Sequence, residues 1–146
     1  MANVYSFLNI NCTLTGPGGI INLAAGAAAA EEGVTLEATE DKNVMTIGAD
    51  GRGQHSLIAS NACTLTIRLL KTSTVNAQLQ VMYDLQSSSS ALWGQNTFSL
   101  VDTARADATV VQQACFKKKP TLTYAKEAGM MEWVFDGISA GTLLGP

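Results

Sequence analysis

Apolar and polar residues alternate along several segments of the chain. The clearest is "CTLTIRLL", residues 63–70, in which every second residue is apolar. This is the period of a β-strand with one buried face. The same alternation predicts strands in "NVYSFLNINCTLTG" (3–16), "VTLEATE" (34–40), "NVMTI" (43–47), "NTFSLVD" (96–102), "ATVVQQACFKK" (108–118) and "TLTYAKEAGMMEWVFDGI" (121–138). We expect the last to be a hairpin that turns near residues 127–129, with Met131, Trp133 and Phe135 on one side.

One segment has the period of a helix instead. Its apolar residues recur three and four positions apart, in a stripe of Val75, Leu79, Met82 and Tyr83 that is widened by Ala77, Val81 and Leu85. This spacing predicts an α-helix over about residues 74–86, capped by Ser73 or Thr74 and ended by the serine run 87–90. The polar side chains of the helix are then expected to face away from the sheet: Gln78, Gln80, Asp84 and Gln86.

Together these elements predict a mainly β fold, an antiparallel β-sandwich or barrel with one flanking α-helix. The sequence contains no internal repeat and no linker, so residues 1–146 are expected to form a single domain. The Ala/Gly-rich stretch 24–30 is expected to be an extended loop, because Gly26, Glu31 and Glu32 interrupt a helical pattern there.

The chain carries few charges. Charged residues make up 14% of it and hydrophobic residues 47%, against about 25% charged residues in an average soluble protein. A surface so poor in charge is typical of a protein that partners largely cover. The net charge is −3, which argues against a protein that grips phosphate groups.

No membrane segment is expected. The longest apolar stretch, "GIINLAAGAAAA", is shorter than the roughly 20 residues that span a bilayer. The first residues, "MANVYSFLNINC", lack the basic start and the cleavage site of a secretion signal. We therefore expect a protein that is made in the cytoplasm and does not associate with membranes.

No motif indicates catalysis. His55 is the only histidine and has no nucleophile motif around it, so a surface position is expected. Cys12, Cys63 and Cys115 lack the spacing of a metal site and are expected to be buried thiols. The segment "GADGRG", residues 48–53, lacks the pattern of a phosphate loop and is expected to be a β-turn with "DG" at its tip. We expect no enzyme, no cofactor and no metal.

Two segments carry a resemblance to a known family. They are "EDKNVMTIGADG" (40–51) and "KKKPTLTYAKE" (117–127), which combine uncommon residues in a fixed order. With "VYSFLNINCTLTGPGG", "IRLLKTS" and "ALWGQNTFS", they make nearly the whole chain resemble the tail tube subunits of contractile-tailed bacteriophages, which are similar to the tube protein of type VI secretion. The resemblance implies a structural virion protein with a barrel-like β fold. Six copies would form a ring, and stacked rings would form the tube through which DNA leaves.

The resemblance also implies partners. These are further copies of the chain, the tail sheath protein, the baseplate and tail terminator proteins, and phage DNA that passes through the lumen without specific binding. The protein would be located in the virion tail after assembly in the cytoplasm of the host bacterium. The residues agree with this in two ways. Sheet edges completed by neighbouring copies would close a ring, and the "TLT", "QQ" and "TST" segments offer small polar side chains to line a passage.

Two sets of residues are candidates for contacts in such an assembly. One is the candidate contact between stacked rings, because an extended segment there reaches beyond its own subunit: Glu37, Glu40, Asp41, Lys42 and Asn43. The other is the outer face of the helix, directed toward a neighbour or the sheath: Gln78, Gln80, Asp84 and Gln86.

Two other interpretations remain open from the sequence. The first is the tube of a phage-derived bacteriocin or injection device, which would have the same kind of subunit. The second belongs to another class, a monomeric β-sandwich module that binds a small ligand.

Overall fold

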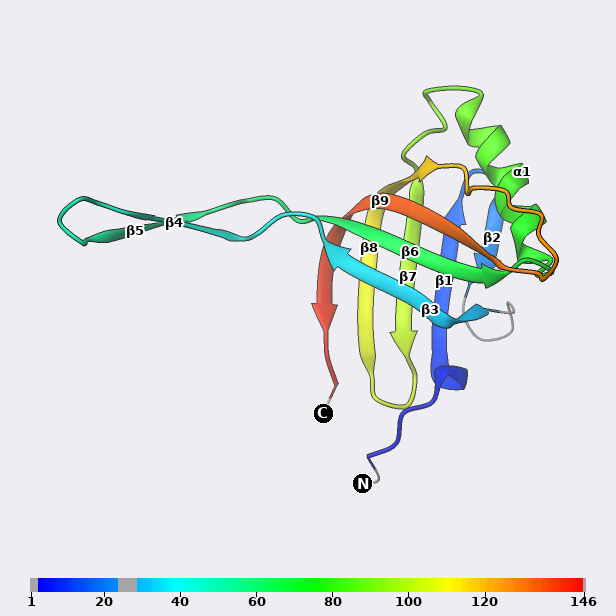
Figure 1. The fold of residues 1–146 in the computed structure, drawn as a ribbon, viewed down its shortest axis with the longest axis horizontal. Coiled ribbons are helices and arrows are strands. Elements are labelled where there is room, and N and C mark those ends of the chain that lie inside the picture. The colour runs from blue at the N-terminus through cyan, green and yellow to red at the C-terminus, as the bar shows by residue number, and fades with distance from the viewer. Residues whose placement is uncertain (1–2, 24–28, 146) are drawn as a thin grey trace.

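The computed structural model describes residues 3–23 and 29–145. Over these residues the fold is mainly β, with a single α-helix, as the sequence predicted (Figure 1). The elements are the short 3-10 helix Phe7–Asn9, the helix α1 (Val75–Ser87), and the strands β1 (Ile10–Gly16), β2 (Gly19–Asn22), β3 (Ala29–Ala38), β4 (Asn43–Ile47), β5 (Gly53–Leu57), β6 (Ala62–Leu70), β7 (Asn96–Asp102), β8 (Asp107–Lys118) and β9 (Met130–Leu143).

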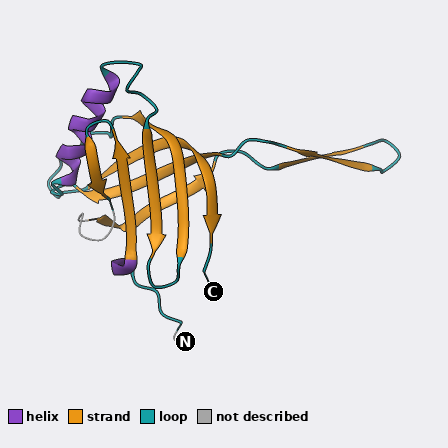
Figure 2. Cartoon of the chain, turned by 180° about the vertical axis from the view of Figure 1, so that it is seen from behind, coloured by secondary structure: helices purple, strands orange, loops and turns teal. Residues whose placement is uncertain are grey.

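The strands of the described chain form one large sheet and one small one. The large sheet has seven antiparallel strands in the order β2-β1-β7-β8-β9-β6-β3. It folds over itself, so that β3 and β6 cross β1, β7 and β8 (Figures 1 and 2). The long strand β9 joins the two layers, pairing with β6 from Met130 to Ile138 and with β8 from Val134 to Leu143. The result is sandwich-like, and it is not a closed barrel because β2 and β3 remain unpaired with each other.

The bend of the sheet is located where β8 meets β9. Their register shifts three times, between Val110 and Val111, between Gln112 and Cys115, and between Phe116 and Lys118. Such bulges bend a strand and increase its twist. Gly137 on β9 contributes too, because a Cβ atom there would lie 2.5 Å from the Cγ1 atom of Val111. Only a glycine lets the two strands approach so closely.

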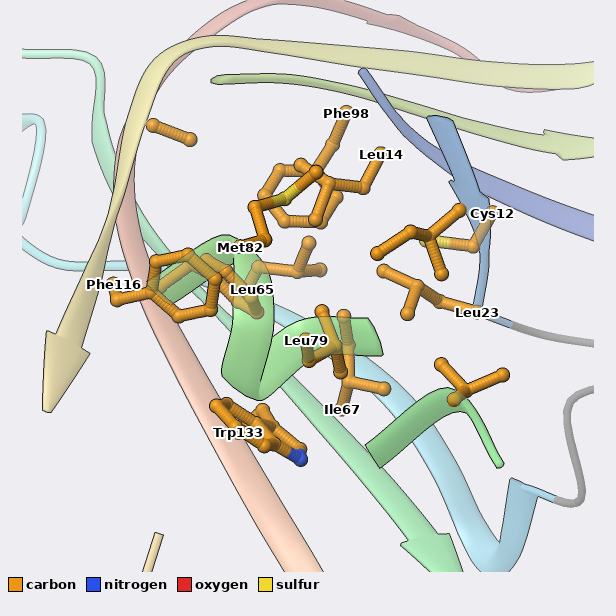
Figure 3. Close-up of a cluster of buried hydrophobic side chains, with 14 of the residues drawn as sticks. Cys12, Leu14, Leu23, Leu65, Ile67, Leu79, Met82, Phe98, Phe116 and Trp133 are labelled. Carbon is orange, nitrogen blue, oxygen red and sulfur yellow. The ribbon is translucent and has the colours of Figure 1, made fainter. Parts of the chain in front are cut away.

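The hydrophobic core lies between the layers and under α1 (Figure 3). Phe135 is its centre: its ring centroid lies 4.7 Å from that of Phe98 and 4.6 Å from that of Phe116. The helix contributes Leu79 and Met82, both fully buried. The predicted apolar side of β9 is confirmed, since its inward residues are buried: Met131, Trp133 and Phe135.

Helix α1 begins and ends within one residue of its prediction. The Oγ atom of Ser73 accepts a hydrogen bond from the backbone N–H of Val75 at 3.2 Å, whereas Thr74 makes no side-chain cap. At the other end, the Ser88 hydroxyl donates to the carbonyl of Leu85 at 2.6 Å. The helix is tied to the sheet by Trp133, whose indole N–H donates to the Oδ1 atom of Asn76 at 3.0 Å.

Two predicted strand segments are wrong in part. Residues 121–125 are not a strand, so the expected hairpin over 121–138 does not form. The partner of β9 is β8 instead, and residues 119–129 connect them. At the N-terminus, residues 7–9 form a 3-10 helix because the Ser6 hydroxyl accepts a hydrogen bond from the N–H of Leu8 and caps it. Strand β1 therefore begins only at Ile10.

Two smaller predictions and one unpredicted strand complete the comparison. Residues 24–28 of the expected loop lie outside the described residues, and strand β3 already begins at Ala29. Strand β2, Gly19–Asn22, was not predicted, because four residues are too short to show alternation. The "TST" segment, residues 72–74, lies in the turn before α1 and on no strand, so it does not belong to a strand face.

Candidate assembly surfaces

The small sheet is a projecting hairpin, which we call the arm (residues 43–57). Its strands β4 and β5 pair only with each other among the described residues, and they extend away from the large sheet (Figure 1). Every residue of both strands is exposed. The tip is a turn closed by a 3.0 Å hydrogen bond from the N–H of Gly51 to the carbonyl of Gly48. Gly51 has φ +87°, a conformation that favours glycine. The predicted turn with "DG" at its tip is thus confirmed.

The arm has one apolar face and one polar face. The pairs Asn43 with Leu57, Met45 with His55 and Ile47 with Gly53 point to one side, because directly opposite residues in antiparallel strands share a face. A 3.1 Å contact between Asn43 Nδ2 and His55 Nδ1 agrees with this. The apolar side chains on this face are Met45, Ile47 and Leu57, which are 58%, 56% and 82% exposed.

A hairpin of this kind needs support. Two isolated strands are at best marginally stable in water, and exposed apolar side chains gathered on one face are typical of a binding surface. Nothing in the described part of the same chain covers the arm. Its apolar face therefore suits contact with another molecule.

The five residues predicted for the contact between rings lie together at the root of the arm. Glu37 is near the end of β3, the next three lie in the connection, and Asn43 begins β4; all are exposed: Glu37, Glu40, Asp41, Lys42 and Asn43. Lys42 also has a role within the chain, since its Nζ atom donates to the carbonyl of Ser60 at 2.9 Å and to Oδ1 of Asn61 at 2.8 Å. This ammonium group ties together the two segments that enter and leave the arm.

Of the four residues predicted for the outer face of α1, two are exposed and one is half-buried. Gln78 and Asp84 are exposed, and Gln80 is half-buried and donates to Asp84 Oδ1 at 3.0 Å. The prediction for Gln86 is wrong, because this side chain is fully buried. Its amide donates to Asn96 Oδ1 at 2.7 Å and accepts from Asn96 Nδ2 at 2.8 Å. Buried polar side chains are hydrogen-bonded, and the spacing of apolar residues along a helix does not reveal whether such a partner exists.

The apolar side of α1 was predicted too broadly. The residues expected to widen the buried stripe are exposed instead: Ala77, Val81 and Leu85. They recur every fourth residue, so they form a second apolar stripe along the outside of the helix. Sequence spacing alone cannot separate a buried stripe from an exposed one beside it.

The large sheet ends in two strands that have one neighbour each, β2 and β3. The outer edge of such a strand presents unpaired N–H and C=O groups, which pair readily with another chain. β2 spans four residues and β3 ten. Among the described strands, the large sheet therefore ends at two edges that have no partner strand, in addition to the arm.

The three cysteine thiols all have a raised pKa. Burial raises the pKa of Cys12 from 9.0 to about 12. Burial, and then the charge of Asp136, raise the pKa of Cys63 and of Cys115. These thiols are therefore protonated near neutral pH and poor nucleophiles. No three His, Cys, Asp or Glu side chains of residues 3–23 and 29–145 are grouped as metal ligands, and none of the helices there is long and apolar enough to cross a membrane.

Comparison with known proteins decides the family. The family model described as "Bacteriophage PhiTE tail tube protein" matches residues 1–145. The chain belongs to this family of phage tail tube proteins. Membership makes it a structural and non-enzymatic component of a phage tail. The search of curated proteins found no match.

Solved structures show the same fold at low sequence identity. One is a chain in the cryo-EM structure of an extracellular contractile injection system, the PVC sheath-tube complex in its extended state. That match has a TM-score of 0.56 at 10% identity and covers 99% of this chain and 93% of the other. The second is a chain of the anti-feeding prophage (AFP) baseplate, 6-fold symmetrised, with a TM-score of 0.50 at 8% identity and coverage of 99% and 97%. The tail tube fold is thus shared with chains of contractile injection systems.

Proposed function

We propose that this tail tube protein assembles into hexameric rings, and that the rings stack into the inner tube of a contractile phage tail, the conduit for DNA ejection. The observation that carries the proposal is the combination of an exposed arm with two open sheet edges in a member of the tail tube family. In a monomer, the arm would stay fully exposed to water.

Ring formation follows from the open edges. A head-to-tail contact, in which one side of a copy binds the opposite side of the next, generates a ring when the rotation between copies closes. Such a ring completes edges that would otherwise stay unpaired. A structurally similar chain belongs to a baseplate with 6-fold symmetry, which supports six copies.

The passage for DNA needs a surface that does not hold phosphate groups. The net charge of −3 per chain agrees with this, because a phosphate backbone meets no overall attraction. The outer face of β1 and β7 is a suitable lining, since it carries uncharged polar side chains in register: Thr13 opposite Ser99, and Thr15 opposite Thr97. The amides at positions 112 and 113 of β8 extend the same layer.

We assign the remaining surfaces to contacts along and around the tube. The root of the arm is the proposed contact between stacked rings, through Glu37, Glu40, Asp41, Lys42 and Asn43. The outer face of α1 is proposed to meet a neighbour or the sheath, through Gln78, Gln80 and Asp84. The sheath, the baseplate and the tail terminator are the proposed protein partners, with assembly in the cytoplasm of the host bacterium.

A direct experiment tests the proposal. The purified protein is analysed by size exclusion and by negative-stain electron microscopy at increasing concentration. We expect rings or hollow tubes. A protein that stays a monomer of 15.3 kDa at high concentration would contradict the proposal and favour the ligand-binding module.

The related interpretation, a bacteriocin or injection-device tube, predicts the same rings. Its discriminating feature is the particle, because a virion contains a DNA-filled head. Mass spectrometry of purified particles is expected to find the chain in headed particles that contain DNA. Finding it in headless tubes alone would favour the bacteriocin or injection device.

A further inference from the structure

An apolar groove lies between α1 and β2, and we call it the α1–β2 groove. Gly18, Gly19 and Ile20 line one wall and Ala77 and Val81 the other. Ile20 is 72% exposed and Val81 67%. Leu85 extends the helical wall, because its Cδ2 atom lies 3.4 Å from where a Cβ atom of Gly18 would be. Because Gly18 and Gly19 have no side chains, they leave space in the groove.

None of the residues 3–23 and 29–145 is seen to fill this groove. In Figures 1 and 2, α1 and β2 lie at one end of the molecule, whereas the arm extends from the opposite end. The arm carries another exposed apolar surface of the described chain, formed by Met45, Ile47 and Leu57. The two surfaces are therefore unable to meet within one chain, and they are positioned to meet between two copies.

Their chemistry is complementary. The apolar face of the arm carries no permanently charged residue, since its polar members are Asn43 and His55. The residues that line the α1–β2 groove are apolar apart from Gln78. If either apolar surface packed against a charged surface, charged groups would be buried without partners. If the two apolar surfaces pack against each other, apolar area on both loses contact with water, which is favourable.

We propose that the apolar face of the arm of one copy docks in the α1–β2 groove of the next copy. The inference rests on the proposed assembly and specifies a contact within it. Every copy supplies one arm and one groove at opposite ends, so the contact is head-to-tail and every copy uses both. An isolated two-stranded hairpin has little stability of its own. In this contact, helix α1 of the neighbouring copy would stabilise the arm.

Disulfide trapping tests the contact. In the double variant Ile47→Cys/Val81→Cys, one cysteine lies on the apolar face of the arm and the other in the groove. The matched control is Val44→Cys/Val81→Cys, because Val44 is on the same strand but on the polar face. After assembly and mild oxidation with copper phenanthroline, non-reducing electrophoresis of the first variant is expected to show a ladder of linked chains. The control and the unmodified protein are expected to lack it.

The outcomes separate the contact from the assembly. Tubes that form without a ladder, or with an equal ladder in the control, overturn the docking and leave the proposed function standing. If the unmodified protein forms neither rings nor tubes, both fall.

A second pair of variants guards against misfolding. Ile47→Lys and Val81→Glu each place a charge on an exposed position, so each is expected to fold but to lose assembly. A mixture of the two proteins is expected to regain assembly, because alternating copies place each lysine arm in a glutamate groove and each unchanged arm in an unchanged groove. The chain that carries both substitutions is expected to regain assembly, because each new lysine then meets a new glutamate. Failure of the combined variant to regain assembly, with both single variants folded by circular dichroism, overturns the docking.

Discussion

Strands β6 and β4 carry the same alternating pattern but differ in what covers them. In β6 the inward side chains Leu65 and Ile67 are 2% and 0% exposed, while in β4 the corresponding Met45 and Ile47 are more than half exposed. β6 lies between two strands under an aromatic core, whereas β4 has β5 as its single neighbour. Alternation therefore predicts that a strand has an apolar face. It does not predict whether that face is covered by its own chain or by another.

The comparison predicts that stability comes from the sheet and assembly from the arm. Stability is measured in each case by denaturant unfolding at concentrations where the chain is monomeric, because assembly would otherwise add to the apparent stability.

The largest effect is expected in the core. Trp133→Ala removes a fully buried side chain that contacts Phe116 and donates to Asn76. Large-to-small changes of this kind lower the free energy of unfolding by about 3–5 kcal/mol. A loss below about 1 kcal/mol would show that this region packs more loosely than a core.

The buried amide pair is expected to have the next effect. Asn96→Ala leaves the Oε1 atom of Gln86 buried without its Asn96 donor, while the Nε2 atom keeps the carbonyl of Pro17. A buried polar group that loses its partner costs about 1–3 kcal/mol. Gln78→Ala is the matched control, since Gln78 is an exposed glutamine on the same helix, and it is expected to change stability little. Equal losses in the two variants would contradict a structural role for the pair.

A pH effect tests the buried thiol. The pKa of Cys12 is raised to about 12 in the fold, so between pH 9 and 12 the unfolded chain loses the thiol proton while the folded chain keeps it. The free energy of unfolding therefore falls as pH rises through this window. From pH 9 to 10, we expect the unmodified protein to lose about 1 kcal/mol more than Cys12→Ala loses over the same range. Equal pH slopes would show that Cys12 is not buried as described.

The smallest effect on the monomer is expected in the arm. Met45→Ala and Leu57→Ala remove side chains that are already in water, so each is expected to change the free energy of unfolding by less than about 0.5 kcal/mol. Both variants are nevertheless expected to assemble more weakly, as measured by the concentration at which rings appear. A large loss of monomer stability would mean that the arm packs on its own sheet.

Local patterns predicted most of the individual elements. Helix α1 and strands β6, β7 and β8 have long, regular periods and lie close to their predicted bounds. The errors occur where a contact outside the segment decides the structure. Residues 121–126 were assigned to the first strand of a hairpin, but no strand of the described chain pairs with them.

The assembly surfaces were predicted less completely, for the same reason. The charged residues of an extended segment, among them Glu40 and Asp41, led to the prediction of a contact at the root of the arm. The sequence did not lead to a prediction for the apolar face of the arm. Helical spacing placed Val81 in the core and Gln86 outside, and both are reversed. Gln86 has a partner inside the protein in Asn96, which is ten residues away in sequence.

The amino-acid sequence by itself determined the mainly β character, the place of the helix, the turn at residues 48–51 and the resemblance to tail tube proteins, because these depend on periods and motifs within short segments. Only the tertiary structure decided which apolar faces are buried, how β9 joins the two layers, and that the arm and the α1–β2 groove lie at opposite ends. Those features depend on which segments meet in space, and periodicity along a chain carries no information about the partner.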